Sequence, residues 1–229
     1  MNLRIEDRLV RYDMGQGAES FSPMSDAVLP YHVVQGHQVH GNRIAVVDSD
    51  RLTRADLEGF DAFVTDVPGI ALGARTADCV PVLLYDPVNR AVAAVHSGWK
   101  GTVLKIAASV LERMHELYGT DAANVRAVIG PSIGPDSFQI GPEVADSFAA
   151  AGFPMAEILS DCGERVPGTM QGGLHLDLWK ANAWILRQAG VRQQSVLVAG
   201  IDTYTDTRFF SARREGAACG RTVNTIKLE

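Results

Sequence analysis

Two short apolar runs joined by a turn constrain the fold of this chain most strongly. The first run spans residues 80–85, the second spans 91–95, and residues 86–89 between them read Asp-Pro-Val-Asn. Proline fixes φ and Asp or Asn bonds its own backbone, so the segment predicts a turn and the two runs predict a hairpin. Cys79 precedes the first run and His96 follows the second. Because those two ends of a hairpin meet, we expect Cys79 and His96 to be neighbours.

The rest of the chain mixes strands and helices. Residues Leu3 to Val10 predict a short strand, and further strands are expected over residues 44–47, 62–65, 70–74, 125–129 and 196–199. Apolar spacings of three and four, with their caps, predict helices from Thr102 to Gly119, from Pro142 to about Ala150 and from Asp177 to Ala189. Polar and glycine-rich stretches predict irregular segments over residues 15–25, 160–174 and 202–220. The tally indicates an α+β fold, or an α/β fold with a mixed sheet.

Composition narrows the class of protein. The chain has 229 residues, a net charge of −6 and a pI near 5.5, with no run of Lys or Arg, so we expect neither a nucleic-acid partner nor a membrane surface. No stretch approaches the roughly 18 apolar residues of a membrane span. No secretory signal is visible at the N-terminus, and three widely spaced cysteines do not make a disulfide framework, so a cytoplasmic location is expected.

Three metal-competent residues lie at the edges of expected strands. A thiolate from Cys79 and imidazoles from His40 and His96 suit Zn²⁺, and three protein ligands leave a fourth position open, as in catalytic sites. Their wide separation in the sequence is a weak signal by itself, because a lone cysteine is commonly a buried apolar residue and a lone histidine a bonded loop residue. Both interpretations stay open on spacing alone.

Five motifs, at residues 38–41, 76–83, 96–102, 129–134 and 209–214, occur in an order that resembles one family. It is called the laccase-domain or multicopper polyphenol oxidoreductase family, also labelled peptidoglycan editing factor and purine nucleoside phosphorylase. The resemblance implies that His40, Cys79 and His96 bind zinc, that residues 1–229 form a single domain, and that the fold is a four-layer α/β/β/α sandwich with mixed sheets.

The chain departs from the family pattern in three places. A glycine-rich stretch near the N-terminus is contracted to residues 21–25, which leaves part of the substrate pocket undefined. Cysteines found after the Gly-Pro loop are replaced by Asp136 and Ser137, and a cysteine before Thr-Tyr is replaced by Asp202. These two replacements indicate that those cysteines are not needed for zinc.

The resemblance implies a zinc-dependent purine nucleoside enzyme with small-molecule nucleoside and phosphate as substrates. The reactions would be phosphorolysis of adenosine, inosine or methylthioadenosine, and deamination of adenosine. Zinc deaminases use a carboxylate as proton shuttle, for which Asp78 is the adjacent candidate, although an anchoring role through hydrogen bonds is favoured for it. Arg75 and Arg213 are candidates for binding phosphate. Ser97 and Lys100 are further candidates, because the backbone of residues 98–102 could cradle an anion at the start of a helix.

Other functions remain open. A multicopper oxidase needs a trinuclear cluster of further histidines, which six histidines without a His-x-His pair do not provide, so a copper polyphenol oxidase is disfavoured although Cu²⁺ could occupy one site. Cys79 as nucleophile and His96 as base would instead make a Cys-His hydrolase acting on an amide or on a peptidoglycan precursor. A metal-holding or partner-binding module is the non-enzymatic alternative.

Overall fold

The computed structural model describes residues 1–164, 166 and 168–229. The middle of the fold is a six-stranded sheet built from β4 (Ile44–Val46), β5 (Ala62–Thr65), β7 (Val80–Asp86), β8 (Ala91–Ser97), β9 (Arg126–Ile129) and β13 (Val196–Val198). Its strand order is β13-β9-β7-β8-β5-β4. The sheet is mixed, because the outermost pair at each edge is parallel and the inner neighbours are antiparallel.

The predicted hairpin is confirmed at the centre of this sheet. β7 pairs antiparallel with β8, from Asp86 opposite Ala91 at the turn to Val80 opposite Ser97 at the open end. The carboxylate of Asp86 accepts hydrogen bonds from the backbone N–H groups of Val88 (2.9 Å) and Asn89 (3.2 Å), which closes the turn as the sequence indicates.

Every residue of β7 and β8 is buried, because both faces of the sheet are covered. Val82 and Leu84 point into the core beneath the helices, whereas Leu83 and Tyr85 point into a second core between two sheets. Side chains of a strand alternate between faces, so two covered faces require an uninterrupted apolar run. This requirement explains why the hairpin dominates the sequence pattern.

A second sheet packs against the first and is antiparallel throughout. It differs from the prediction at both ends of the chain: the expected N-terminal strand is two strands, the expected loop at residues 15–25 contains a third, and the C-terminal strand is not predicted at all. The sequence pattern does not reveal these strands, because some of their buried side chains are polar. The hydroxyl of Ser22, for example, donates to the side-chain oxygen of Asn224 at 2.5 Å inside the core. In order, its strands are β1 (Asn2–Glu6), β2 (Leu9–Asp13), β3 (Ala18–Pro23), β14 (Thr222–Leu228) and β6 (Ala71–Thr76).

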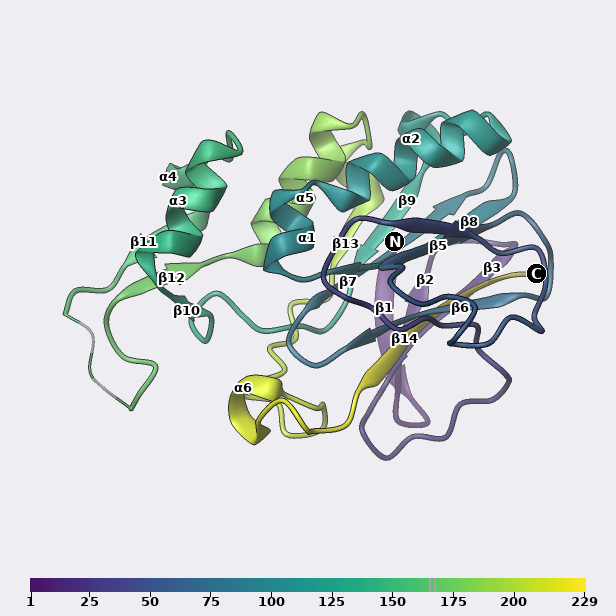
Figure 1. Ribbon diagram of the computed structural model, residues 1–229. Helices are drawn as coiled ribbons and strands as arrows, with labels where there is room; N and C mark the ends of the chain where they lie inside the picture. Colours follow the sequence, from purple (N-terminus) through teal and green to yellow (C-terminus); the bar gives the residue numbers. More distant parts are fainter. Residues whose placement is uncertain (165, 167) are drawn as a thin grey trace.

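Helices α1 (Trp99–Val103), α2 (Ile106–Tyr118) and α5 (Leu178–Gln188) cover the free face of the six-stranded sheet (Figure 1). The predicted N-cap at Thr102 is wrong. Thr102 lies within α1, its hydroxyl bonds the carbonyl of Gly98 (3.0 Å), and left-handed Lys105 (φ 55°) separates α1 from α2. The predicted end of α2 at left-handed Gly119 is confirmed, and so is the Asp177 cap of α5, whose carboxylate accepts from the N–H of Lys180.

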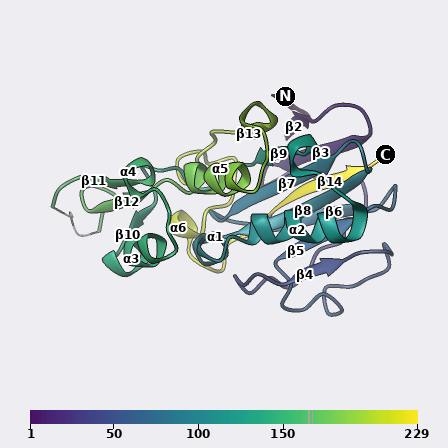
Figure 2. The same cartoon turned by 90° about the horizontal axis from the view of Figure 1, so that it is seen from above.

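A smaller group of elements extends from one end of the six-stranded sheet (Figure 2). The helix predicted from Pro142 is confirmed, whereas the loop predicted over 160–174 begins and ends in strands; residues 165 and 167 of that loop lie outside the described residues. The segment 202–220, expected to be irregular, contains the short helix α6 (Ala212–Glu215). The group comprises β10 (Gln139–Ile140), α3 (Pro142–Ala150), α4 (Met155–Ile158), β11 (Leu159–Asp161) and β12 (Leu174–Leu176).

The layers therefore run from helices to the six-stranded sheet and then to the five-stranded sheet, and the predicted α+β class is confirmed. The four-layer sandwich would place helices on the outer face of the second sheet. In the part of the chain described, the extended segment 31–34 lies on that face instead. Tyr31 packs edge-on against Phe21 and donates to Glu19 at 2.9 Å, while Val34 bonds the backbone of β6. Among the described residues, no helix combines the length and apolar character needed to span a bilayer.

Candidate functional site

The open end of the hairpin brings Cys79 and His96 together, as predicted. His96 is the penultimate residue of β8 and lies opposite Pro81 of β7, two residues after Cys79. Cys79, Pro81 and Leu83 alternate onto the face that carries His96, so the thiol and the imidazole emerge on the same side of the sheet. The hairpin register alone thus places two of the three candidate ligands.

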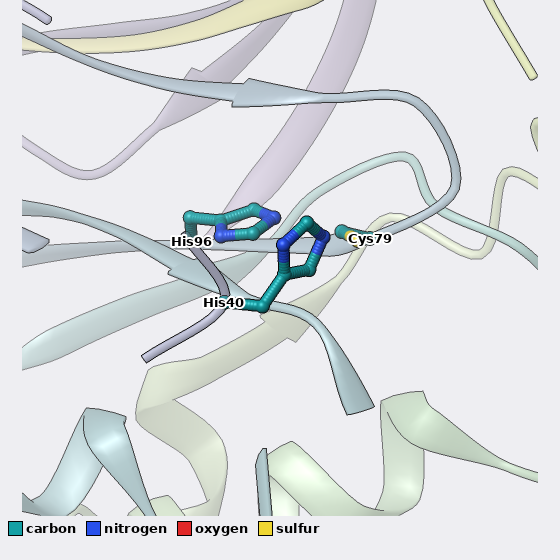
Figure 3. Close-up of side chains that lie close together, drawn as sticks. All are labelled: His40, Cys79 and His96. Carbon is teal, nitrogen blue, oxygen red and sulfur yellow. The ribbon is translucent and has the colours of Figure 1, made fainter. Parts of the chain in front are cut away.

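His40 completes the group from the loop that precedes β4. Its backbone is left-handed (φ 63°), an uncommon conformation for a residue with a side chain. The sulfur of Cys79 and the ring nitrogens of His40 and His96 all lie within 4.8 Å of one another, and the three side chains point toward a common centre (Figure 3). The two imidazole rings are 4.8 Å apart between centroids and nearly perpendicular. One cysteine and two histidines from three separate segments therefore meet at one point.

Asp61, at the start of β5, holds two of these ligands and is fully buried. Its carboxylate accepts from Nδ1 of His96 (2.8 Å) and from the backbone N–H groups of His40 (2.9 Å) and Gly41 (2.8 Å). Burial raises the pKa of the Asp61 carboxyl, but the hydrogen bonds from His96 and Gly41 outweigh it, so the pKa is lowered and the group is a carboxylate. With Nδ1 occupied, His96 presents Nε2 to the common centre.

The charges of the site favour a thiolate in the metal-free chain. Burial raises the pKa of the Cys79 thiol, yet the imidazoles of His96 and His40 offset this and lower the pKa to about 6. Burial lowers the pKa of His96, whereas the Cys79 thiolate and the Asp61 carboxylate raise it to about 9. Each group thus stabilises the charged form of the other, and a thiolate is the form of cysteine that binds metals.

Gly98 permits the close approach of the ligands. A Cβ atom at this position would lie 3.0 Å from Sγ of Cys79 and 3.1 Å from Cδ2 of His40. Its backbone is extended (φ −64°, ψ 171°), so the requirement for glycine here is one of space and not of conformation. The glycine between β8 and α1 is therefore part of the site.

The donor set fits a metal ion. A thiolate and two imidazoles are the ligands that Zn²⁺ and other borderline metals prefer, and a carboxylate bonded to the far nitrogen of a ligating histidine is the usual outer partner in such sites. Asp61 supplies that partner for His96. Among the described residues, His40, Cys79 and His96 are the one group of three with this spacing.

These residues form part of the wall of a cleft of about 770 Å³, which is large enough for a small organic ligand. Arginine is the most frequent charged residue in the wall. Of the predicted phosphate-binding residues, Arg75 and Arg213 lie in the cleft, and Arg54 and Arg221 join them there.

Asp78 also borders the cleft, with a left-handed backbone (φ 79°). Both of its carboxylate oxygens are already bonded, one to the hydroxyl of Thr203 (2.7 Å) and the other to the backbone N–H of Arg213 (2.6 Å), while its carbonyl accepts from Ile133 (3.0 Å). Asp78 thus ties three distant segments together around Cys79. This geometry favours the anchoring role over that of a proton shuttle.

Ser97 and Lys100 do not reach the cleft. The side chain of Ser97 points to the opposite face of β8, where it donates to the side-chain amide oxygen of Asn182 (2.8 Å) and lies 3.0 Å from the hydroxyl of Thr102. Lys100 is exposed on α1, and its amine lies 5.6 Å from the ring centroid of Trp99. An anion cradle is expected at residues 98–102, but these residues are not among the described residues that line the cleft. Helix α1 lies on the other face of the sheet.

Two positions that depart from the family pattern face one another. The hydroxyl of Ser137 donates to the carboxylate of Asp202 (2.5 Å), and the backbone N–H of Gly134 donates to the second oxygen (2.9 Å). Where the family pattern has cysteines, this chain therefore has a hydrogen-bonded polar pair, and neither residue is among those that line the cleft.

Sequence reasoning missed three residues of the site, namely Asp61, Arg54 and Arg221. The only signal for Asp61 is an acidic residue at the edge of the apolar strand 62–64. Arg54 and Arg221 carry no local signal, because only the folded chain brings their segments to the cleft.

Comparison with known proteins agrees with the fold and the ordered motifs. The sequence profile described as "Multi-copper polyphenol oxidoreductase laccase" matches residues 19–229. The chain belongs to this family. Within it, the chain is similar to a protein named "Purine nucleoside phosphorylase" from Bacteroides thetaiotaomicron, with 43% identity over 75% of this chain. That match spans only 62% of the relative's own length.

Two further members are matched over nearly the whole chain. The protein named "Adenosine deaminase RL5", from an unknown prokaryotic organism, is 38% identical over 98% of this chain and 82% of its own length. The crystal structure of Bacillus licheniformis hypothetical protein YfiH superposes with a TM-score of 0.88 at 26% identity and covers 99% of both chains. The two relatives matched by sequence are thus named for purine nucleoside reactions, and the YfiH structure has the fold described above.

Proposed function

We propose that this chain is a metal-dependent enzyme of purine nucleosides, with residues 1–229 acting as one domain. The observation that carries the proposal is the meeting of His40, Cys79 and His96 in the wall of an arginine-lined cleft of about 770 Å³. A cleft of this size accommodates a nucleoside together with phosphate. The names of the two relatives, a purine nucleoside phosphorylase and an adenosine deaminase, support the same substrate class.

Two reactions follow from that substrate class. In phosphorolysis of adenosine, inosine or methylthioadenosine, a phosphate oxygen bonds to C1′ while the C1′–N9 bond breaks, and the phosphate proton passes to the purine. In deamination of adenosine, water adds at C6 and ammonia leaves, which yields inosine. Both reactions use only a purine nucleoside and a small co-substrate, phosphate or water.

We infer that zinc is the metal, with copper as the alternative. His40, Cys79 and His96 would hold it, and when bound it supplies Lewis-acid chemistry at the cleft wall. The carboxylate of Asp61 accepts a hydrogen bond from Nδ1 of His96, so Nε2 of His96 faces the common centre. The carboxylate of Asp78 holds the loop of Cys79 against the segment of Arg213, through the backbone N–H of Arg213.

A Cys-His hydrolase, acting on an amide or a peptidoglycan precursor, is the second candidate. The observation that favours it is the alignment of Asp61, His96 and Cys79 as carboxylate, imidazole and thiol, the order found in nucleophilic catalysis. His40 is superfluous in such a site but is expected in a metal site, which is why we prefer the metal enzyme. A copper polyphenol oxidase is disfavoured, because the described residues contain a single His-Cys-His group.

The test is to incubate the purified protein with adenosine, with and without phosphate. The expected products are adenine and ribose 1-phosphate, or inosine and ammonia, with turnover lost on chelation and restored by zinc. Cys79→Ala should abolish turnover, whereas Cys162→Ala, at an exposed cysteine, should not. Absence of both reactions in metal-loaded protein would contradict the proposal, and activity in metal-free protein that is lost on alkylating Cys79 would favour the hydrolase.

A further inference from the structure

Among the described residues, none of the four arginines that line the cleft has an acidic partner. Arg54, Arg75 and Arg221 come from the loop before β5, from β6 and from the segment before β14, and all three line the cleft. In the part of the chain that the structure describes, none of them forms an ion pair, although many other surface arginines do. The cleft therefore carries a local excess of positive charge within a protein of net charge −6.

Neutral oxygens orient two of these guanidinium groups. Arg75 donates to the side-chain oxygen of Gln35 (3.1 Å), and Arg221 donates to the backbone carbonyls of Ala217 (2.8 Å) and Gly220 (2.9 Å). Such partners fix the direction of a guanidinium without neutralising its charge. The backbone of Arg75 is held as well, through a pair of hydrogen bonds with the side-chain amide of Gln38.

The three charges repel one another in the free protein. Burial lowers the pKa of Arg75, and the guanidinium groups of Arg54 and Arg221 lower it further. Neighbouring like charges in a partly buried site are unfavourable unless an anion sits between them. An anion bound among these groups would offset the repulsion.

Two further charged residues of the wall, Asp78 and Arg213, are held by other contacts. Asp78 is the one carboxylate among the described lining residues, and its oxygens are bonded to Thr203 and to the backbone of Arg213. Arg213 is itself engaged, since its guanidinium donates to the carbonyl of Gln139 (3.1 Å) and lies over the ring of Phe138. The guanidinium groups of Arg54 and Arg221, but not that of Arg213, lower the pKa of Arg75, so these three arginines form a set distinct from Arg213.

We infer that Arg54, Arg75 and Arg221 bind inorganic phosphate, and that this site determines whether a bound nucleoside is phosphorolysed or deaminated. The inference rests on the proposed function. Guanidinium groups bind phosphate oxygens in pairs, which positions the phosphate for attack on C1′. Deamination adds water at C6 and has no anionic reactant, so it does not require the three arginines. The ratio of the two products therefore reports on the anion site.

Phosphate titration by calorimetry with zinc-loaded protein tests the site directly. Arg54→Gln, Arg75→Gln and Arg221→Gln should each weaken phosphate binding about 10- to 100-fold, as expected for loss of charge-assisted hydrogen bonds. The ratio of adenine to inosine formed from adenosine should fall by a similar factor. Arg51→Gln is the matched control, because Arg51 is exposed on the same loop as Arg54 but lies outside the cleft.

Arg54 is exposed, and its side chain makes no hydrogen bond among the described residues, so Arg54→Gln tests the inference without threatening the fold. Unchanged phosphate affinity in the three variants would overturn the inference, and so would an unchanged product ratio. Failure of the proposed function has a different signature. The wild-type protein would then produce neither adenine nor inosine, while the titration would still decide whether the arginines bind phosphate.

Discussion

The carboxylate of Asp61 lies 2.8 Å from Nδ1 of His96, and the same oxygen accepts the backbone N–H of His40 at 2.9 Å. One buried side chain thus orients the imidazole of one candidate ligand and the main chain of another. The left-handed backbone of His40 is held in place by the same carboxylate. The geometry of the site therefore depends on a residue that is not itself a ligand.

Replacing Asp61 should weaken metal binding without removing a ligand. Asp61→Asn keeps the shape of the side chain but loses the charge that fixes the proton on Nδ1 of His96, and changes of such outer partners cost about 10- to 100-fold in metal affinity. Competition with a chromogenic chelator measures the affinity. Asp50→Asn, at an exposed residue, should leave it unchanged. Equal affinity in a folded Asp61→Asn protein would refute the role assigned to Asp61.

Gly98→Ala should disturb the site through crowding alone. The added Cβ would lie 3.0 Å from Sγ of Cys79 and 3.1 Å from His40, so the ligands must move apart. Overpacking of this kind costs about 1–3 kcal/mol, from which we expect a loss of about tenfold or more in metal affinity. Gly41→Ala is the matched control on the other side of His40, where the nearest atom is 3.4 Å away. If the two variants bind metal equally well, Gly98 is not required for space.

The reactivity of Cys79 should follow its lowered pKa. In metal-free protein, alkylation by iodoacetamide should reach half its maximal rate at a pH of about 6, because thiolate is lost below that value. His96→Asn removes the neighbour that lowers the pKa most and should move the midpoint to higher pH. His115→Asn, which changes an imidazole on α2, is the control. Mass spectrometry of the modified peptide reads the rate, and identical midpoints in all three proteins would show that His96 does not activate the thiol.

The hairpin turn should make stability depend on acid pH. Burial raises the pKa of Asp86, but hydrogen bonds from Asn89 and Val88 outweigh it and lower the pKa. A lowered pKa stabilises the fold above the pKa of the unfolded carboxyl, and this contribution is lost as the pH falls through the folded value.

Asp86→Asn should therefore lower the free energy of unfolding by about 1–3 kcal/mol at pH 7, the range for hydrogen bonds to a charged group. The difference from wild type should shrink as the pH is lowered below about 4, near the pKa of an unperturbed carboxyl. Urea unfolding across this pH range measures it, with Asp146→Asn on the exposed face of α3 as control. A difference that stays constant with pH would mean that the charge of Asp86 contributes nothing.

The sequence predicts those parts of the fold whose determinants are local. The turn at residues 86–89 and the two apolar runs specify the hairpin, and the hairpin register then places His96 beside Cys79. The caps at Asp177 and Gly119 are equally local and are confirmed. Thr102 misleads because its hydroxyl bonds backward within α1, a choice that the intrinsic preference of threonine for helix starts does not reveal.

Long-range polar contacts account for what the sequence does not predict. The sequences of β14 and β3 look polar because they contain Asn224 and Ser22. These two side chains lie 202 positions apart and form a hydrogen bond with each other inside the core. Asp61 acquires its role from His40, Gly41 and His96, which lie 20 to 35 positions away. The arginines of the cleft come from separate segments that only the fold brings together. For His40, its place at a strand edge makes it only a candidate ligand, and the family resemblance supplies the stronger prediction, since its spacing from Cys79 carries little information by itself.

The most direct test of the account is the metal content of purified protein and of its single-ligand variants, measured by elemental analysis. The central claim is that His40, Cys79 and His96, from three separate segments, hold one metal ion together. We predict one zinc per wild-type chain, and its loss in His40→Ala, Cys79→Ala and His96→Ala, with His115→Ala retaining it. Metal retained at full occupancy in any of the three ligand variants, or none in wild type after reconstitution with zinc, would contradict the claim.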